Sequence, residues 1–281
     1  MNHTSSISKY MTLIFKVFKY LAEFLFKPKK LLQIINSKRK KMDQDQLNSL
    51  WSNQNYILSQ IALVSPGFYE EHKGITEIEH QVGRYLNMQI VCREIAADKI
   101  EGDIVEFGTW QGLGLILLAN CFDGEKIQRK LIGIDSFEGL PESSTIWMKG
   151  AFSNTSLGLV EKNIQSKIAL NSFLSVMLIK GFFSDSFVGE QLASTCKEIA
   201  LIHFDADLGS STTQALSLIE PYLVNRAKPI YFLFDDWGCH PDEVPDAFLT
   251  WLPRAINKFK LQAHKLSSTR FTRYYKITFD H

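Results

Sequence analysis

Carboxylate side chains follow four of the segments that we predict to be buried strands. In an open α/β sheet, ligands bind outside the carboxyl ends of the strands, so these acids are expected to share one rim. Several carboxylates on one rim repel each other, and a cationic or hydroxyl-rich group should offset that repulsion. The acids are Glu106, Asp135, Asp205 with Asp207, and Asp235 with Asp236.

Three of these acids form a set that contains only oxygen ligands. Asp205 follows one predicted strand, and Asp235 and Asp236 follow the next. Hard oxygen ligands without Cys or His suit Mg²⁺ or Mn²⁺ far better than zinc. An Asp-Asp pair alone often serves as a helix N-cap. Together with Asp205, the pair favours a metal site.

A glycine-containing turn lies between a predicted strand at 104–107 and a predicted helix at 113–121. Glycines let backbone N–H groups approach a ligand, and the helix start carries a partial positive charge. Such a turn serves dinucleotides, phosphates and S-adenosylmethionine (SAM) alike, or it simply needs small residues. The spacing of Gly108, Gly112 and Gly114 lacks the dinucleotide fingerprint G-x-G-x-x-G.

Asp135 follows the second predicted strand, within Ile132-Gly133-Ile134-Asp135-Ser136. A carboxylate at this position can accept hydrogen bonds from both hydroxyls of a ribose. The other interpretation is that Asp135 forms a turn or caps a helix.

Strands alternate with helices from residue 100 onward, which predicts a doubly wound, mostly parallel seven-stranded sheet with an antiparallel C-terminal edge hairpin. Residues 1–41 are expected to form a basic extension, 42–99 a linker and helical cap, and 100–281 the main domain. Strands are predicted at 104–107, 130–134, 176–179, 199–204, 230–234, 261–265 and 272–278, and helices at 75–99, 113–121, 157–165, 187–196, 211–223 and 243–259.

Charge is distributed unevenly along the 281 residues. Residues 1–41 contain ten Lys or Arg and one acid, which gives +9, and the remainder carries −8, so the net charge is +1. The apolar fraction of 45% is typical of a globular protein with a large core. The four cysteines are far apart, which argues against a disulfide framework or structural zinc and for a reducing, cytoplasmic location.

Residues 10–26 fit a helix whose polar side chains fall in one narrow arc. Its charges argue against a transmembrane span or a secretory signal. A polybasic run follows Pro28. One interpretation is peripheral contact of residues 10–41 with the inner face of a membrane. The other is packing on the body or on a second copy in a homo-oligomer. We expect no nucleic-acid partner.

Five segments together resemble the macrocin/mycinamicin (TylF/MycF-type) sugar O-methyltransferases, metal-dependent members of the class I SAM superfamily. The resemblance covers about residues 80–281. The segment D-S-F-E-G-L-P and the D-x-D followed by D-D are specific only in combination. The five segments are 102–112, 135–141, 180–186, 203–212 and 234–238.

The resemblance implies an enzyme that uses SAM and Mg²⁺ (or Mn²⁺) to methylate a hydroxyl of a sugar in a glycan or glycosylated small molecule. It implies that Asp207 is the catalytic base and that Asp205, Asp235 and Asp236 hold the metal. By position, the residues that bind SAM are Glu106, Gly108, Thr109, Gly112, Asp135, Ser136 and Gly181.

Two positions depart from the family pattern. Gly209 stands where an aromatic residue is usual, and Arg226-Ala227-Lys228-Pro229 replaces a Pro-Gly-Gly turn. Rival functions are a catechol-type O-methyltransferase, a nicotinamide-dependent oxidoreductase and a membrane-associated binding protein without catalysis. The glycine spacing and the acid-rich rim count against the oxidoreductase.

Overall fold

The computed structural model describes residues 75–122, 126–168, 173–237, 243–268 and 271–280. All of them lie in one compact unit. The predicted extension 1–41 and the linker from 42 to 74 lie outside the described residues. So do Cys239 and His240, which follow Asp235 and Asp236 closely in the sequence.

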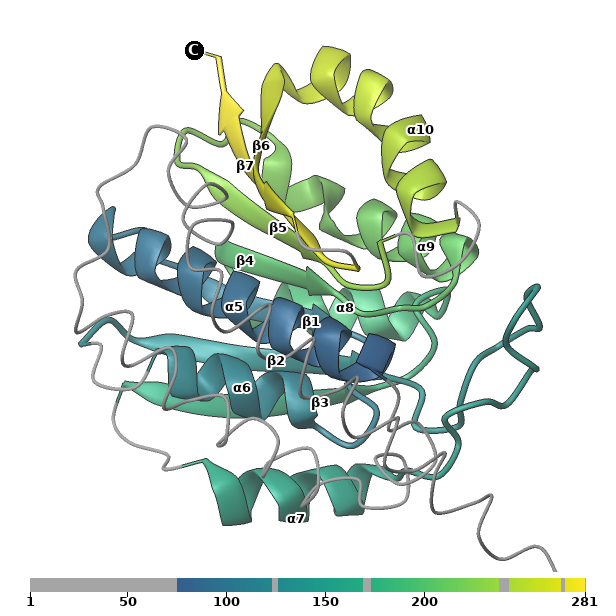
Figure 1. The fold of residues 1–281 in the computed structure, drawn as a ribbon. Coiled ribbons are helices and arrows are strands. Elements are labelled where there is room, and N and C mark those ends of the chain that lie inside the picture. The colour runs from purple at the N-terminus through teal and green to yellow at the C-terminus, as the bar shows by residue number, and fades with distance from the viewer. Residues whose placement is uncertain (1–74, 123–125, 169–172, 238–242, 269–270, 281) are drawn as a thin grey trace, which may run out of the picture. The chain divides into compact units, whose positions relative to one another are not determined.

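Seven strands form one sheet in the order β3-β2-β1-β4-β5-β7-β6 (Figure 1). The first five are parallel, and β7 pairs antiparallel with both β5 and β6. The predicted fold class and the antiparallel hairpin are therefore confirmed, with β6 at the edge. The strands are β1 (Asp103–Phe107), β2 (Arg129–Asp135), β3 (Leu174–Lys180), β4 (Ile199–Phe204), β5 (Ile230–Phe234), β6 (Leu261–Ser268) and β7 (Arg273–Phe279).

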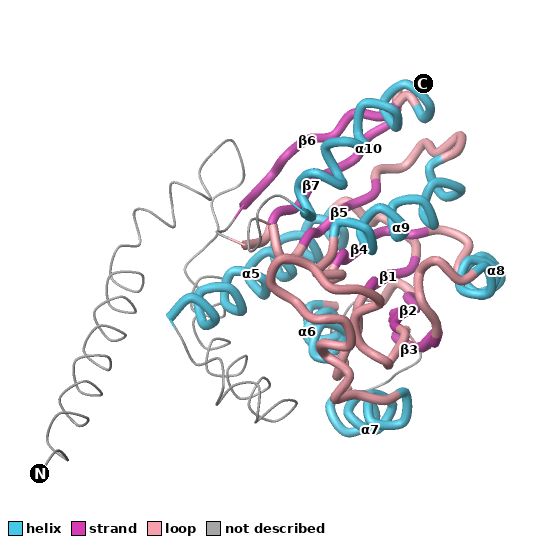
Figure 2. Tube along the Cα trace, turned by 90° about the vertical axis from the view of Figure 1, so that its right-hand side faces the viewer, coloured by secondary structure: helices cyan, strands magenta, loops and turns pink. Residues whose placement is uncertain are grey.

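Helices cover both faces of the sheet, and the strands lie between the two layers in Figure 2. Alternation along each strand sends successive side chains to opposite faces, so Ile104 packs on one layer and Val105 on the other. The first layer contains α5 (Ile75–Ala97), α6 (Leu113–Cys121) and α7 (Leu157–Lys167), and the second contains α8 (Ser186–Thr195), α9 (Gly209–Ile219) and α10 (Glu243–Phe259).

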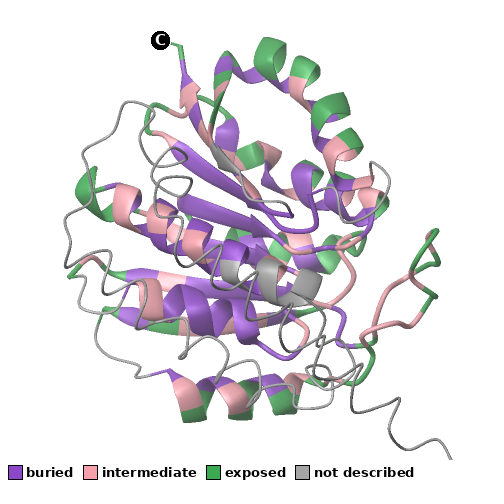
Figure 3. Cartoon of the chain, viewed as in Figure 1, coloured by how far each residue is buried: buried purple, intermediate pink, exposed green. Residues whose placement is uncertain are grey.

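Burial follows the sequence pattern closely. All residues of β4 and β5 are buried, as expected for central parallel strands that are covered on both faces (Figure 3). In α6, every residue from Leu113 to Ala119 is buried. The predicted helix 211–223 instead divides into α9 and a 3-10 turn at Glu220–Leu223, where Pro221 has no backbone N–H to continue the α-helix.

Helix α5 packs into the core of the sheet unit. Met88, Val91 and Ile95 are fully buried within the first layer, so this helix contributes directly to the core beside the strands. None of the described helices is both long enough and apolar enough to cross a membrane.

Candidate active site

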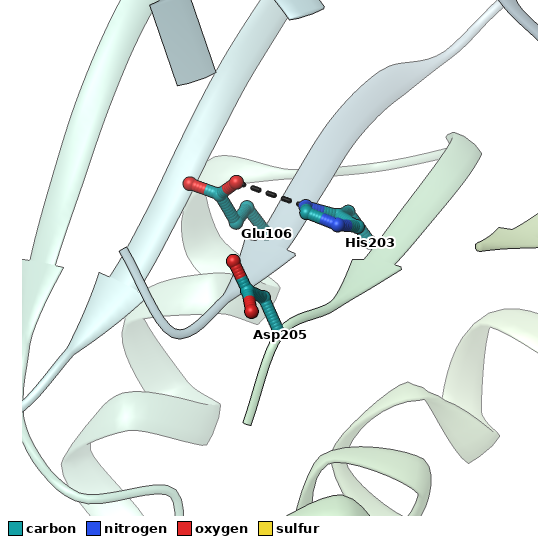
Figure 4. Close-up of side chains that lie close together, drawn as sticks. All are labelled: Glu106, His203 and Asp205. Carbon is teal, nitrogen blue, oxygen red and sulfur yellow. Dashed lines mark hydrogen bonds and ion pairs between the residues drawn. The ribbon is translucent and has the colours of Figure 1, made fainter. Parts of the chain in front are cut away.

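The paired strands β1 and β4 carry a buried acid and a buried histidine at the same level. Glu106 lies opposite His203 in the register, and His203 Nδ1 is 2.9 Å from Glu106 Oε1. Neither side chain is exposed. Asp205 lies just beyond the end of β4, and Figure 4 shows it beside this pair.

Burial determines the protonation of the Glu106–His203 pair. It raises the pKa of Glu106 to about 8. Burial, together with the positive charge of Arg84, lowers the pKa of His203 to about 4. Both groups are therefore neutral near pH 7, and they share one hydrogen bond between Glu106 Oε1 and His203 Nδ1. The second atoms, Glu106 Oε2 and His203 Nε2, have no hydrogen-bond partner among the described residues.

Two residues of α5 bind the acids that follow β4 and β5. Arg84 Nη2 lies 2.8 Å from Asp205 Oδ2, and Arg84 Nη1 lies 3.0 Å from Asp235 Oδ2. His80 Nε2 lies 2.7 Å from Asp235 Oδ1. One guanidinium thus bridges the residues that follow two strands, and the two oxygens of Asp235 face the guanidinium of Arg84 and the imidazole of His80.

These contacts give the neighbouring carboxylates different proton affinities. Burial by itself raises the pKa of Asp235, but His80 and Arg84 outweigh it and hold the pKa below its ordinary value. Burial raises the pKa of Asp205 to about 7, although Arg84 opposes this. Burial and then the charges of Asp236 and Asp205 raise the pKa of Asp207 well above its usual range.

Two of the acids have an uncommon backbone conformation that sets the direction of their side chains. Asp207 and Asp236 both adopt a positive φ of 56°, a left-handed conformation that Asp tolerates better than most residues. The next residue after Asp236, Trp237, packs among the aromatic rings of Phe234, Phe248 and Tyr275. This packing holds the turn that presents Asp235 and Asp236.

Four carboxylates lie at the rim. Repulsion among Asp205, Asp207, Asp235 and Asp236 adds to burial in raising the pKa of Asp205 and Asp207. His80 and Arg84 offset these effects at Asp235. A divalent cation would favour the ionised form of all four acids, and carboxylate oxygens are its preferred ligands.

The described residues contain one group of three potential ligands whose donor atoms lie within 4.8 Å of one another, namely Glu106, His203 and Asp205. Asp235 and Asp236 are not in that group. The predicted metal residues are therefore adjacent but do not converge on one point while Arg84 lies between Asp205 and Asp235.

The glycines of the β1–α6 turn make room for protein groups. A Cβ on Gly108 would lie 1.7 Å from the Asp205 carbonyl oxygen, and one on Gly114 would lie 1.8 Å from Glu106 Oε1. Gly112 begins α6 with a φ of 90°. Close packing on Asp205 and Glu106 thus accounts for Gly108 and Gly114, and the positive φ accounts for Gly112. This agrees with the interpretation that the turn needs small residues, which the sequence left open beside close approach of a ligand.

Asp135 ties this turn to the end of β2. Its Oδ2 accepts hydrogen bonds from the backbone N–H groups of Thr109 and Trp110, both at 2.8 Å, and its Oδ1 accepts from Phe137 N. A carboxylate has about four acceptor positions, so about one remains for a ligand hydroxyl. Asp135 therefore has the turn-forming role that the sequence left open, with limited capacity for a ribose.

The other predicted cofactor residues lie around Asp135. Gly181 N donates to the Asp135 carbonyl oxygen, and Ser136 Oγ donates to the Gly139 carbonyl oxygen. Thr109, Asp135, Ser136 and Gly181 thus meet where β1, β2 and β3 end. Glu106 does not join them, because its carboxylate is fully buried beside His203.

Residues 138–156 form a long loop that contacts both parts of the site. Asn154 Oδ1 accepts from Trp110 Nε1 at 2.8 Å, and the Asn154 carbonyl oxygen accepts from Gln111 Nε2 at 3.0 Å. Glu142 accepts a hydrogen bond from Ser210, which lies just after the acid rim. The loop therefore connects the β1–α6 turn to the segment that follows β4.

The two departures from the family pattern have local structural explanations. A Cβ on Gly209 would lie 2.8 Å from the Glu243 carbonyl oxygen, so a larger residue would displace the start of α10. In the loop before β5, Arg226 Nη2 donates to the carbonyl oxygens of Ile199 and Pro229. Arg226 thus holds the loop that replaces the glycine turn.

The sequence analysis missed His80 and Arg84. Their signal is a set of polar residues on one face of the helix, since His80, Arg84 and Asn87 are spaced four and three residues apart. Asn87 Nδ2 donates to Thr272 Oγ1 at 2.6 Å. The apolar periodicity predicted the helix correctly but drew attention away from these polar residues.

Comparison with known proteins gives relatives of one kind. A rhamnosyl-tetracenomycin-C 4'-O-methyltransferase of Streptomyces olivaceus is 29% identical over 147 residues, covering 49% of this chain and 54% of that protein. A demethyldecarbamoylnovobiocin O-methyltransferase of Streptomyces niveus is 22% identical over 169 residues, covering 57% and 62%. This chain thus aligns with less than two thirds of either relative.

Solved structures share the fold. The O-methyltransferase NovP superposes with a TM-score of 0.58 at 19% identity, covering 80% of this chain and 99% of that one. The calicheamicin methyltransferase CalS11 superposes with a TM-score of 0.52 at 19% identity, covering 84% and 94%. The profile of the macrocin-O-methyltransferase (TylF) family matches residues 73–251. The chain therefore belongs to the macrocin-O-methyltransferase (TylF) family.

Proposed function

We propose that this protein transfers a methyl group from SAM to a sugar hydroxyl of a glycan or glycosylated small molecule, with Mg²⁺ or Mn²⁺ bound. The observation that carries the proposal is the carboxylate rim beside the β1–α6 turn, where burial and neighbouring carboxylates raise the pKa of Asp205 and Asp207. Family membership supports methyl transfer. One relative's name includes a dimethoxyrhamnosyl group, which supports a sugar acceptor.

In this proposal the cofactor lies over the ends of β1, β2 and β3. Gly108, Gly112 and Thr109 shape the turn beneath it, and Asp135, Ser136 and Gly181 border it. Glu106 lies at the end of β1, just before that turn, and contacts His203 on β4. The sulfonium of SAM supplies the methyl group, and alignment of the acceptor oxygen with that methyl lowers the barrier.

The acceptor is proposed to lie over the ends of β4 and β5. Asp205, Asp235 and Asp236 would hold the divalent ion, which would orient a diol and lower the pKa of its hydroxyl. Asp207 takes the hydroxyl proton as the oxygen acquires the methyl group, and S-adenosylhomocysteine remains. The high pKa of Asp207 makes it a strong base once it is deprotonated.

The proposal is tested by incubating the full chain with SAM, Mg²⁺ and either a rhamnosylated acceptor or a catechol. We expect the sugar to gain one methyl group, detected by mass spectrometry, and excess EDTA to stop the reaction. Methylation of the catechol alone would assign the protein to the phenolic class. No product from either acceptor, together with no SAM binding by calorimetry, would contradict catalysis.

The metal assignment has its own variant. Asp235→Asn combined with Asp236→Asn should abolish turnover while SAM still binds, because the predicted cofactor residues lie on other strands. Asp246→Asn, an exposed acid on α10, is the matched control. If turnover persists in the doubly substituted protein and in excess EDTA, the metal assignment is wrong.

A further inference from the structure

Arg84 is a buried cation that lies between two carboxylates of the proposed metal site. Its side chain is 8% exposed, and its two terminal nitrogens contact Asp205 and Asp235, which follow different strands. Burial by itself lowers the pKa of Arg84, but the two carboxylates outweigh it and keep the guanidinium charged. A permanent positive charge therefore lies between two of the three residues proposed to hold the ion.

A divalent ion at these carboxylates would face that charge directly. Each carboxylate oxygen has two lone pairs, so Arg84 and an ion can share the same acid. They nevertheless repel each other over a few ångströms inside a largely buried site, where electrostatic effects are stronger than in water. The same charge stabilises the acids when no ion is present, since buried carboxylates without a partner are costly.

We propose that Arg84 is a built-in counter-cation that neutralises Asp205 and Asp235 in the ion-free protein and weakens their binding of a divalent ion. The inference rests on the proposed metal site. Helix α5 supplies this residue, and its buried Met88 and Val91 fix the helix against the sheet. The position of Arg84 is therefore set by core packing and does not depend on the ion.

A purely structural role for Arg84 predicts a different result. If Arg84 only held the two strand ends in place, its removal would disorder the ligands and weaken ion binding. If it is a counter-cation, its removal lowers stability without the ion but tightens ion binding. The two roles thus predict opposite signs for the change in ion affinity.

The experiment is calorimetric titration of the full chain with Mg²⁺ alone, together with thermal melting in EDTA. Arg84→Gln should bind Mg²⁺ at least about tenfold more tightly than wild type, a change of about 1.4 kcal/mol, and should melt at a lower temperature in EDTA. Arg84→Lys keeps the charge and should bind Mg²⁺ with nearly the wild-type Kd. Arg93→Gln removes a charge from the same helix, nine residues or about 13 Å further on, and should leave the Kd unchanged.

A folded Arg84→Gln protein with an equal or weaker affinity overturns the proposal while the metal site stands. Absence of Mg²⁺ binding by wild type and Arg84→Gln alike overturns the metal site and this inference together. If Arg84→Gln does not fold in EDTA, refolding is followed against Mg²⁺ concentration. If the variant folds at Mg²⁺ concentrations below the wild-type Kd, the result supports the proposal, because the ion then replaces the missing counter-cation. If the variant does not fold at any Mg²⁺ concentration, the proposal is overturned.

Discussion

The carboxylates at the rim lie close together, but their pKa values are shifted in opposite directions. Asp235 is held ionised by His80 and Arg84, whereas Asp207 has its pKa raised by burial and by neighbouring carboxylates. Neighbouring acids whose pKa values are pushed apart are a common basis for separate chemical roles. The separation favours Asp235 as a permanent anion and Asp207 as the group that exchanges a proton.

Asp207→Asn should lower kcat by about 10²–10⁴-fold, the usual contribution of a general base, with the SAM affinity little changed. Initial rates and SAM calorimetry check this. His240 follows Asp235 and Asp236 closely in the sequence and is the alternative candidate for the base; it lies outside the described residues. His240→Ala should mainly raise the KM for the acceptor. A larger loss of kcat in His240→Ala than in Asp207→Asn would reverse the two roles.

The Glu106–His203 pair predicts a stability change with pH. The pKa of Glu106 is raised from 4.5 to about 8 in the folded protein, so its favourable contribution is complete below about pH 4.5 and is lost as the pH rises towards 8. Glu106→Gln mimics the protonated acid and can still donate to His203. Melting in EDTA should therefore show the variant gaining stability over wild type as the pH increases across this window. A constant difference in Tm would contradict the neutral pair.

At the level of elements, apolar patterns predicted the helices and strands of the described unit nearly completely. Strand 199–204, strand 230–234 and helix 243–259 match the structure. The predicted site residues mostly lie at one rim, because parallel strands end on the same side. The bridge from α5 was not predicted, because Arg84 and Asp235 are about 150 positions apart and nothing local couples them.

The glycine turn shows a second limit of local reasoning. A strand–glycine–helix pattern correctly predicts the turn, but it does not reveal what needs the missing side chains. Here Gly108 and Gly114 accommodate Asp205 and Glu106, and these contacts exist only once β4 lies beside β1 and α6 packs on the sheet.

The loop 138–156 is predicted to act as a lid. It is anchored at Asn154 and Glu142, and between these residues it exposes Ile146 and Met148, which are 50% and 76% exposed. Loops of this length often close over ligands. Trypsin should cut after the exposed Lys149, more slowly when S-adenosylhomocysteine and acceptor are bound.

Lys149→Gln controls for the site of cleavage in that experiment, since it removes the trypsin site without altering the anchors. Equal cleavage with and without ligands would make the segment an ordinary surface loop.

For the whole molecule, the family match and the described residues begin at nearly the same position, although the match ends at residue 251, before β6 and β7. The match begins at residue 73 and the first described helix at Ile75, so the catalytic proposal concerns this unit. Residues 1–41 carry +9 while the remainder carries −8. This asymmetry calls for a separate explanation, because residues 1–41 lie outside the family match.

The basic extension is predicted to bind anionic membranes peripherally. Each Lys or Arg near such a surface contributes about 1 kcal/mol, so replacing Lys38, Arg39, Lys40 and Lys41 with Gln should weaken binding by roughly 10²–10³-fold. Cosedimentation of the full chain with phosphatidylserine vesicles measures this, and phosphatidylcholine vesicles should bind weakly. Replacing four exposed lysines of the described unit with Gln, at 126, 162, 197 and 260, makes the same change in net charge and should have little effect. If the wild-type chain stays in solution with both lipids while the first variant changes its oligomeric state, the extension binds a second copy instead of a membrane.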